Sequence, residues 1–139
     1  MAGNIRFEVV TPEKVVVDEE ARIVAAPGVL GEFGVLVGHT PFLTPLKTGV
    51  IHYTDANGTE RFVFVSGGFA ETLPHKITIL AESAERRKDI DIDRAKAAME
   101  RAQQRLAEDR AKADIDFIRA RAALERSLVR IRLADSRRI

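Results

Sequence analysis

The sequence predicts an α+β chain: an N-terminal all-β sandwich of about ten short strands, followed by a C-terminal antiparallel two-helix hairpin. Residues 1–84 contain many short apolar runs at close turn spacing, which is typical of a sandwich or barrel. Residues 85–139 contain no Gly or Pro and are rich in Ala, Arg, Leu, Glu and Lys, the composition of long helices. The charge changes as well, from six basic and ten acidic side chains in the first segment to sixteen and eleven in the second. We therefore expect two domains, 1–84 and 85–139.

The overall composition limits the class of protein. With 139 residues, the chain can hold one ordinary domain or two small ones, and 45% hydrophobic residues are enough for a core. There is no Cys, which excludes disulfides and thiolate metal sites. Neither a secretory leader nor an apolar run of about 18 residues occurs, so we expect a cytosolic chain that does not span a membrane.

The strands of the first domain are predicted from alternation and from turn residues. Ile5, Phe7 and Val9 alternate with polar neighbours, the pattern of a half-buried strand. Further extended runs lie at 14–17, 21–26, 29–37, 50–54, 60–65, 69–72 and 76–81. Asn57-Gly58 stands between two of these runs and is a strong hairpin signal. Ser66-Gly67-Gly68 allows a bulge or a close approach of the backbone.

The helices are predicted from apolar residues that recur in steps of three and four. The two runs are Ile92, Ala95, Met99, Ala102 and Leu106, and then Phe117, Ala120, Leu124, Leu128 and Ile131. The polar stretch 107–114 interrupts the pattern, so we expect the chain to reverse there. A seam rich in Ala lets two helices approach closely but buries little area, and such a hairpin is marginal by itself.

Each helix also carries a row of arginines at one spacing. The rows are Arg94, Arg101 and Arg105 in the first helix, and Arg119, Arg126 and Arg130 in the second. Offsets of seven and eleven residues return to within roughly 20° of the starting direction. In an antiparallel pair both rows should lie on one face of the hairpin, toward which Asp91 also projects. Two interpretations remain open: a solvated outer face, or a site for an anion or an acidic partner.

Signals of catalysis are scarce. The three His residues lie in the first domain without ligand-spaced partners, and the common hydrolase, zinc-protease and phosphate-loop motifs are missing. Gly31, Gly34 and Gly38 are interpreted as turn residues, because no strand-to-helix transition follows them. His39 is expected to hold a turn through a hydrogen bond. We expect no catalytic residues and no metal site.

Several motifs together resemble a known family. Residues 31–49 read GEFGVLVGHTPFLTPLKTG, and Ser66-Gly67-Gly68-Phe69 and the helical hairpin follow in that order. This arrangement, over essentially the whole chain, closely resembles the epsilon subunit of bacterial rotary, proton-translocating ATP synthases. Two positions depart from the family pattern, because Val37 and Thr48 stand where Pro is common. Both lie in turns, so the departures concern the rigidity of local loops.

The resemblance implies a non-catalytic subunit of the central rotor stalk, peripheral to the cytoplasmic face of the cell membrane. In such proteins the sandwich docks on the gamma subunit and on the rotor ring of c subunits. The hairpin exchanges between a folded form and an extended form that inserts into the catalytic alpha/beta hexamer and inhibits ATP hydrolysis. A marginal, Ala-rich hairpin suits such an exchange, because its two packings must differ by only a few kcal/mol.

A shorter motif, I-D-x-x-R-A at residues 90–95, resembles the ATP-binding site of some bacterial epsilon subunits. Carried over by residue, that site comprises Glu85, Ile90, Asp91, Arg94, Ala95, Arg101, Arg126 and Arg130. The resemblance implies ATP as a regulatory ligand that is not hydrolysed. Capping is the competing explanation, because acids at a helix start are favoured whether or not a ligand binds.

A second class of function remains, a basic hairpin that binds nucleic acid or an acidic protein. The net charge of only +1 counts against nucleic acid. The scarcity of aromatic residues also counts against nucleic acid, because Phe117 is the one aromatic side chain of the second domain.

Overall fold

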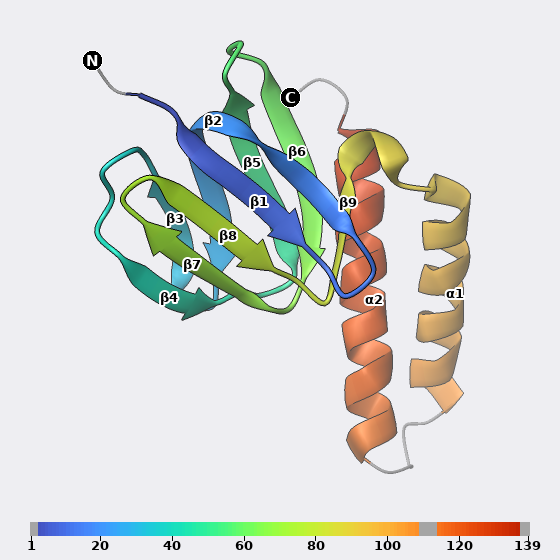
Figure 1. The fold of residues 1–139 in the computed structure, drawn as a ribbon. Helices are drawn as coiled ribbons and strands as arrows, with labels where there is room; N and C mark the ends of the chain where they lie inside the picture. Colours follow the sequence, from blue (N-terminus) through green and yellow to red (C-terminus); the bar gives the residue numbers. More distant parts are fainter. Residues whose placement is uncertain (1–2, 109–113, 137–139) are drawn as a thin grey trace. The chain divides into compact units, whose positions relative to one another are not determined.

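The computed structural model describes residues 3–108 and 114–136, which form two compact units (Figure 1). The first unit ends at Arg87 and the second begins at Lys88. This division falls later than the expected 84/85 boundary, because a ninth strand, β9 (Ser83–Arg86), pairs with β6 (Glu60–Ser66) and belongs to the sheet. Among the described residues, no helix is both long and apolar enough to cross a bilayer.

Nine strands form one continuous sheet that curls into a two-layered sandwich, which confirms the predicted fold class. The others are β1 (Ile5–Val10), β2 (Val15–Gly28), β3 (Gly31–Val35), β4 (Phe42–Pro45), β5 (Gly49–Asp55), β7 (Phe69–Leu73) and β8 (Lys76–Leu80). The order is β4-β7-β8-β1-β2-β5-β6-β9, with β3 also paired to β2. Figure 1 shows β4, β7, β8 and β1 side by side in one layer. Neighbours are antiparallel except β1 and β8, which run parallel.

Strand β2 is one long element where two short runs were expected. The acidic residues between those runs stay extended because they pair with β1, and Asp18 forms an ion pair with Arg6. The first part of β2 pairs with β1, and its later part pairs with β5 and β3. A register shift between Ala21 and Ile23 moves the buried positions of β2 from one alternation to the other. The strand therefore contributes to both layers.

The core lies between the layers and is apolar. Its buried side chains include Ile5, Phe7, Val9, Val17, Val24, Ile51, Tyr53, Val63, Val65, Ile77 and Ile79. Phe7 and Tyr53 meet edge to face, with their ring centroids 4.7 Å apart. Each large side chain buried in this way stabilises the fold by about 1.5–3 kcal/mol.

A polar cluster holds β9 at the margin of this core. The Arg86 Nε donates to the Val16 carbonyl at 3.1 Å, and its Nη1 lies 3.4 Å from the Tyr53 hydroxyl. That hydroxyl donates to Glu19 at 2.5 Å. Burial, together with this bond to a carboxylate, raises the pKa of Tyr53 well above its ordinary value. The next residue, Arg87, lies over the ring of Phe62, 5.3 Å from its centroid. The first unit thus ends in two anchored arginines.

The hairpin predicted from Asn57-Gly58 is confirmed between β5 and β6. The Asp55 carboxylate accepts hydrogen bonds from the backbone N–H groups of Asn57 and Thr59 at 2.9 and 3.0 Å. The Nε of Arg61 donates to the other oxygen of the Asp55 carboxylate at 2.8 Å. Gly58 has a φ of 85°, a value that L side chains rarely adopt.

The predicted close backbone approach at Gly67-Gly68 is also present. Gly68 has a φ of 95°, and a Cβ there would lie 1.9 Å from the Leu80 carbonyl oxygen. The carbonyl of Gly68 accepts a hydrogen bond from the Leu46 N–H at 2.8 Å. This turn therefore requires glycine for both its backbone angle and its space.

The second unit contains α1 (Ile92–Glu108) and α2 (Asp114–Asp135), which pack against each other as a pair. Most of the stretch expected to reverse the chain, 109–113, lies outside the described residues. In α1 the buried residues are Ala95 and Ala102, both on the predicted stripe. In α2 the predicted stripe is partly wrong, because Phe117 and Leu128 are 38% and 36% exposed. The buried residues of α2 are Ala120, Ser127, Leu133 and Ala134. In α2 the small side chains of Ala120 and Ser127 are therefore buried, whereas the larger side chains of Phe117 and Leu128 are exposed to solvent.

Candidate functional site

The I-D-x-x-R-A motif forms the start of α1. The Asp91 Oδ1 accepts a hydrogen bond from the Arg94 N–H at 3.0 Å, and the Asp91 carbonyl accepts one from the Ala95 N–H at 3.0 Å. Asp91 is therefore the N-cap of the helix. Ile90 and Ala95 are buried, with 9% and 4% of their surface exposed. The capping explanation of this motif holds for Asp91, and both apolar members of the motif have packing roles.

The arginine rows meet in a groove between the two helices. This groove has a volume of about 540 Å³, and it is lined by Ala98, Arg101, Ala102, Gln104, Arg105, Glu108, Ala120, Ala123 and Arg126. Arg101 and Arg105 come from α1 and Arg126 comes from α2, so the two rows share a face at these positions, as their spacing predicts. Four alanines separate the arginines, and their short side chains leave room for a ligand close to the helix backbones.

The electrostatics of the groove favour an anion. Among the described residues, no side chain forms a hydrogen bond or an ion pair with Arg101, Arg105 or Arg126. Glu108 is the one acidic side chain among the lining residues, so the charge of the lining is positive. Guanidinium groups bind phosphate and carboxylate oxygens through paired N–H donors.

The remaining members of the carried-over site have other positions. Arg94 and Arg130 do not line this groove. Glu85 lies on β9 in the first unit, where it is the cross-strand partner of Phe64. Arg105 lines the groove but is absent from the carried-over set, although the spacing of the first arginine row includes it.

His39 has the structural role expected of it. Its Nδ1 lies 2.7 Å from the Thr40 carbonyl oxygen, which can only accept, so this nitrogen carries the proton. The ring also packs against Phe42, with centroids 5.2 Å apart. Among residues 3–108 and 114–136, no group of three or more His, Asp or Glu side chains is placed to hold a metal ion.

Comparisons with known proteins decide the family. The beta-sandwich domain of the ATP synthase delta/epsilon chain matches residues 4–87, and its long alpha-helix domain matches residues 88–135. The ATP synthase epsilon chain of Desulfatibacillum aliphaticivorans is 67% identical over 106 residues, which cover 76% of this chain and 75% of that one. The chain belongs to the ATP synthase epsilon chain family. The two domains of this epsilon chain meet at 87/88, where its two structural units also divide.

Other relatives agree with this assignment. The epsilon chain of Carboxydothermus hydrogenoformans is 49% identical over 107 residues, covering 77% of this chain and 79% of that one. The fold is similar to a chain in the mitochondrial ATP synthase of Euglena gracilis, solved as OSCP/F1/c-ring, with a TM-score of 0.73 and 22% identity. That match covers 88% of this chain and 76% of the other. At this identity the likeness concerns the fold alone.

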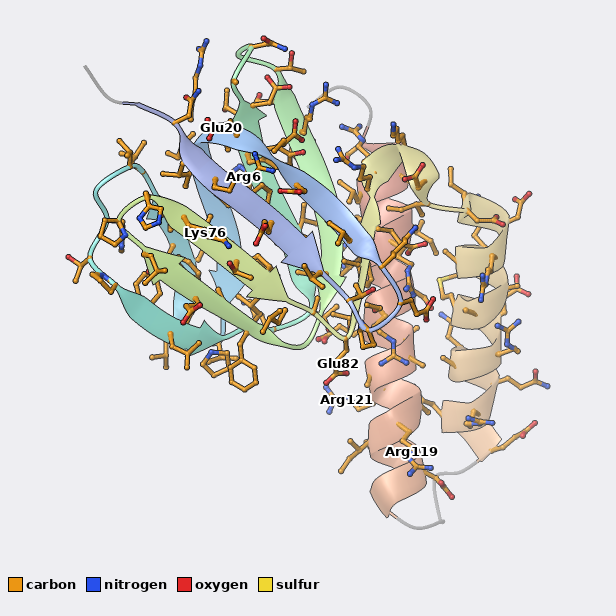
Figure 2. All side chains as sticks on the ribbon, viewed as in Figure 1. Arg6, Glu20, Lys76, Glu82, Arg119 and Arg121 are labelled. Carbon is orange, nitrogen blue, oxygen red and sulfur yellow. The ribbon has the colours of Figure 1, made fainter. Side chains whose placement is uncertain are left out.

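The sandwich of this epsilon chain has an exposed apolar patch, which we define as Leu43, Phe69 and Leu80. These residues are 68%, 51% and 55% exposed. Phe69 is the cross-strand partner of both Pro45 and Leu80, and Leu43 lies two residues before Pro45, so all three share the outer face of β4, β7 and β8. The same face continues into charged residues of β8, β1 and β2, where Figure 2 labels Lys76, Arg6 and Glu20.

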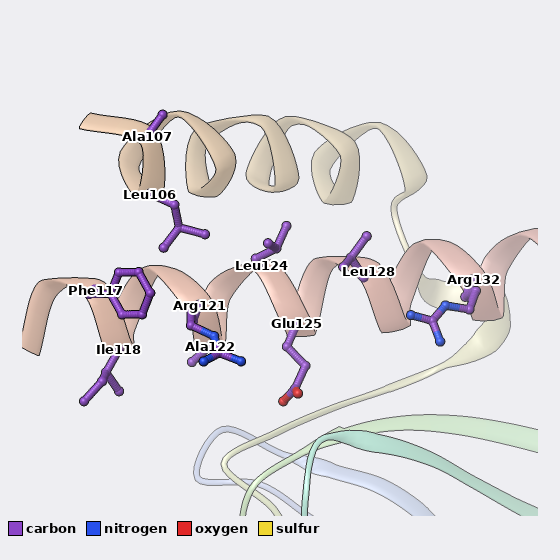
Figure 3. Close-up of a pocket in the computed structure, with 10 residues that line it drawn as sticks. All are labelled: Leu106, Ala107, Phe117, Ile118, Arg121, Ala122, Leu124, Glu125, Leu128 and Arg132. Carbon is purple, nitrogen blue, oxygen red and sulfur yellow. The ribbon is translucent and has the colours of Figure 1, made fainter. Parts of the chain in front are cut away.

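The hairpin has a second, apolar groove of about 920 Å³. It is lined by Leu106, Ala107, Phe117, Ile118, Arg121, Ala122, Leu124, Glu125, Leu128 and Arg132. Figure 3 shows Leu106 of α1 extending toward α2 and Leu124 of α2 extending toward α1. Four large apolar residues that the predicted stripes placed in the seam, Leu106, Phe117, Leu124 and Leu128, therefore line this groove.

Proposed function

We propose that this epsilon chain is a non-catalytic central-stalk subunit whose hairpin inhibits ATP hydrolysis when extended and is held folded by bound ATP. Its sandwich docks on the gamma subunit and on the ring of c subunits, at the cytoplasmic face of the membrane. The family assignment supports the stalk role. The observation that carries the regulatory role is the groove in which arginines of both helices converge without a partner among the described residues.

Docking is supported by the apolar patch. Three large apolar side chains, each more than half exposed on one sheet face, are typical of a surface that another protein covers. Replacing Leu43 or Phe69 by Glu should place a charge in that interface and weaken binding to a gamma–c-ring complex by tenfold or more, about 1.4 kcal/mol. Ile23→Glu is the matched control, because Ile23 is also exposed on a strand but lies outside the patch. Equal binding by all three variants would show that the patch is not the docking surface.

Regulation by ATP follows from the position of the arginines on two helices. A ligand that contacts both helices binds their side-by-side form better than any form in which they separate. ATP therefore shifts the population toward the folded hairpin by that difference in affinity. High ATP should relieve inhibition of hydrolysis, and low ATP should release the hairpin.

Calorimetry of the isolated chain with ATP tests this step. A hydrogen bond to a charged group contributes about 1.5–3 kcal/mol, so Arg126→Ala should weaken ATP binding about tenfold or more. Arg121→Ala is the control, because Arg121 is on the same helix but lines the apolar groove. If the parent binds ATP and Arg126→Ala binds it equally well, the ATP site is elsewhere. Arg94→Ala tests the carried-over site separately, since Arg94 lies outside the groove.

Inhibition is proposed to use charge as well as steric insertion. Helix α2 carries Arg119, Arg121, Arg126, Arg130 and Arg132, basic side chains that suit an acidic segment of the catalytic hexamer. Replacing Arg119, Arg121 and Arg132 together by Ala leaves Arg126 of the groove intact. This variant should raise the ATPase activity of the assembled enzyme without changing ATP binding by the isolated chain. Unchanged ATPase activity would contradict the electrostatic part of the proposal.

A further inference from the structure

The turn between β5 and β6 carries a reactive pair of residues that the proposed function does not use. Asn57 is exposed and is followed by Gly58, and Figure 1 shows this turn projecting beyond the neighbouring strands. The side-chain amide of Asn57 forms no hydrogen bond with any residue that the structure describes. We propose that Asn57 is a site of spontaneous deamidation, and that the Asp55 carboxylate slows this reaction by holding the turn closed.

The reaction joins the Gly58 backbone nitrogen to the Asn57 side chain, with water as the other reactant. The Gly58 nitrogen loses its proton to water or hydroxide and attacks the Cγ of Asn57, whose amide nitrogen takes up a proton and leaves as ammonia. The product is a succinimide ring. Water then opens this ring at either of its two carbonyl carbons, which gives aspartate or isoaspartate, and nothing is oxidised or reduced. In both products a carboxylate replaces the amide, so the turn gains a negative charge.

The residue that follows each asparagine decides which one reacts. The chain has two asparagines, Asn4 and Asn57. A following glycine has no Cβ and adopts backbone angles freely, whereas a β-branched side chain crowds the attacking nitrogen. Asn4 is also exposed, but it precedes Ile5, which is fully buried in β1. Asn4 is therefore an unreactive reference within the same chain.

The hydrogen bonds of the turn hold the reactive nitrogen. The Gly58 N–H donates to the Asp55 carbonyl at 3.0 Å, so its proton is already bonded in the closed turn. The Asp55 carboxylate accepts from the N–H groups of Asn57 and Thr59 at 2.9 and 3.0 Å, on either side of Gly58. Its other oxygen accepts from the Arg61 Nε at 2.8 Å. Ring closure therefore has to wait until the turn opens, and its rate follows the population of the open turn.

The two products should affect the hairpin differently. In isoaspartate the chain continues through the former side chain, so the turn gains a backbone atom between position 57 and Gly58. The Asp55 nitrogen and the Thr59 carbonyl oxygen are 2.9 Å apart across the turn, and the longer backbone cannot keep this bond together with those of the Asp55 carboxylate. Aspartate leaves the length of the backbone unchanged. We therefore expect isoaspartate to loosen this end of the β5–β6 pair and aspartate to leave it closed.

Incubation of the full chain at mildly alkaline pH, followed by peptide mass spectrometry, tests the site. Fragmentation that distinguishes isoaspartate from aspartate should find both at position 57, and it should find an unchanged amide at Asn4. The same chain unfolded in guanidinium chloride should deamidate at position 57 about tenfold faster or more, because the turn is then always open. If the folded chain forms no product at position 57 while the unfolded chain reacts completely, the site is refuted.

Variants of the turn test the role of Asp55. Asp55→Ala should raise the rate at Asn57 about tenfold, because the turn loses its bonds to a charged acceptor. Arg61→Ala should raise it less, since the bonds to Asn57 and Thr59 remain, and it decides the matter if Asp55→Ala fails to fold by circular dichroism. Glu60→Ala is the matched control, because Glu60 is an exposed acid beside the same turn that bonds to none of the described residues. If neither variant reacts faster than Glu60→Ala, the role of Asp55 is refuted.

Thermal unfolding tests the consequence for the hairpin. The aged chain that contains isoaspartate, separated by ion exchange, should melt lower than the parent. Asn57→Asp should melt close to the parent, because it adds the charge without the extra backbone atom. Equal melting of the isoaspartate form and Asn57→Asp would show that the longer backbone does not loosen the turn.

Discussion

Replacing Arg86 by Ala should detach the last strand of the sandwich. The variant loses the 3.1 Å bond to the Val16 carbonyl, the longer 3.4 Å contact with the Tyr53 hydroxyl, and an ion pair with Glu19 at 3.7 Å. A hydrogen bond from a charged donor contributes about 1.5–3 kcal/mol, and a partly exposed ion pair adds at most about 1 kcal/mol. The Arg86 side chain is 26% exposed, so we take the lower part of this range and expect a loss of about 2 kcal/mol in the free energy of unfolding.

For a unit of this size the loss lowers the melting temperature by roughly 8–16 °C. Hydrogen exchange should also accelerate at the amides of β9 before it does so in β1 or β2. Arg22→Ala is the matched control, because Arg22 also donates to a carbonyl, that of Ala56 at 3.1 Å, but on the exposed surface. The control should lose less than about 0.5 kcal/mol. If Arg86→Ala melts no lower than Arg22→Ala, the cluster around Tyr53 does not anchor β9.

Three further predictions concern the sandwich. Gly68→Ala should destabilise it by about 3 kcal/mol or more in urea unfolding, because the new Cβ meets the Leu80 carbonyl at 1.9 Å, whereas Gly34→Ala has open space and should be neutral. The bond from Arg61 holds the pKa of Asp55 below its ordinary value of 3.8. Asp55 therefore contributes stability that is present above about pH 4 and is lost as the pH falls through the lowered pKa. As the pH is lowered through that range, the urea concentration at the unfolding midpoint should decrease for the parent and decrease less for Asp55→Asn. A fragment of residues 1–87 should unfold cooperatively on heating. The shorter fragment 1–84 should melt lower because it lacks Arg86, and equal melting would contradict the role given to β9.

Local chemistry explains which parts of this fold were predictable. The β5–β6 hairpin follows from Asn57-Gly58, and the helices follow from a composition that excludes Gly and Pro. The convergence of Arg101 and Arg126 follows from helical spacing once the two helices are taken as an antiparallel pair. In each case the decisive residues are close in sequence or share one period, so no long-range contact has to be known.

The features that were missed depend on contacts between distant residues. The length of β2 depends on its backbone pairing with β1, which keeps an acidic stretch in the sheet and beside which Arg6 pairs with Asp18. The strand β9 has no apolar alternation, and its sheet position depends on β6 and on the bond from Arg86 to Val16. Periodicity placed both Phe117 and Ala120 in the helix seam, and it does not show that the small Ala120 is buried while Phe117 stays 38% exposed.

The course of β2 has a mechanical consequence. Because one half of this strand is bonded to β1 and the other half to β5 and β3, the two layers share a continuous length of backbone. A load that slides one layer along the other acts on these ladders in shear, so that many hydrogen bonds must fail at the same moment. A load that peels an edge strand such as β9 breaks its bonds one after another. Under such loads the sandwich should yield first at its margin, at an edge strand such as β9.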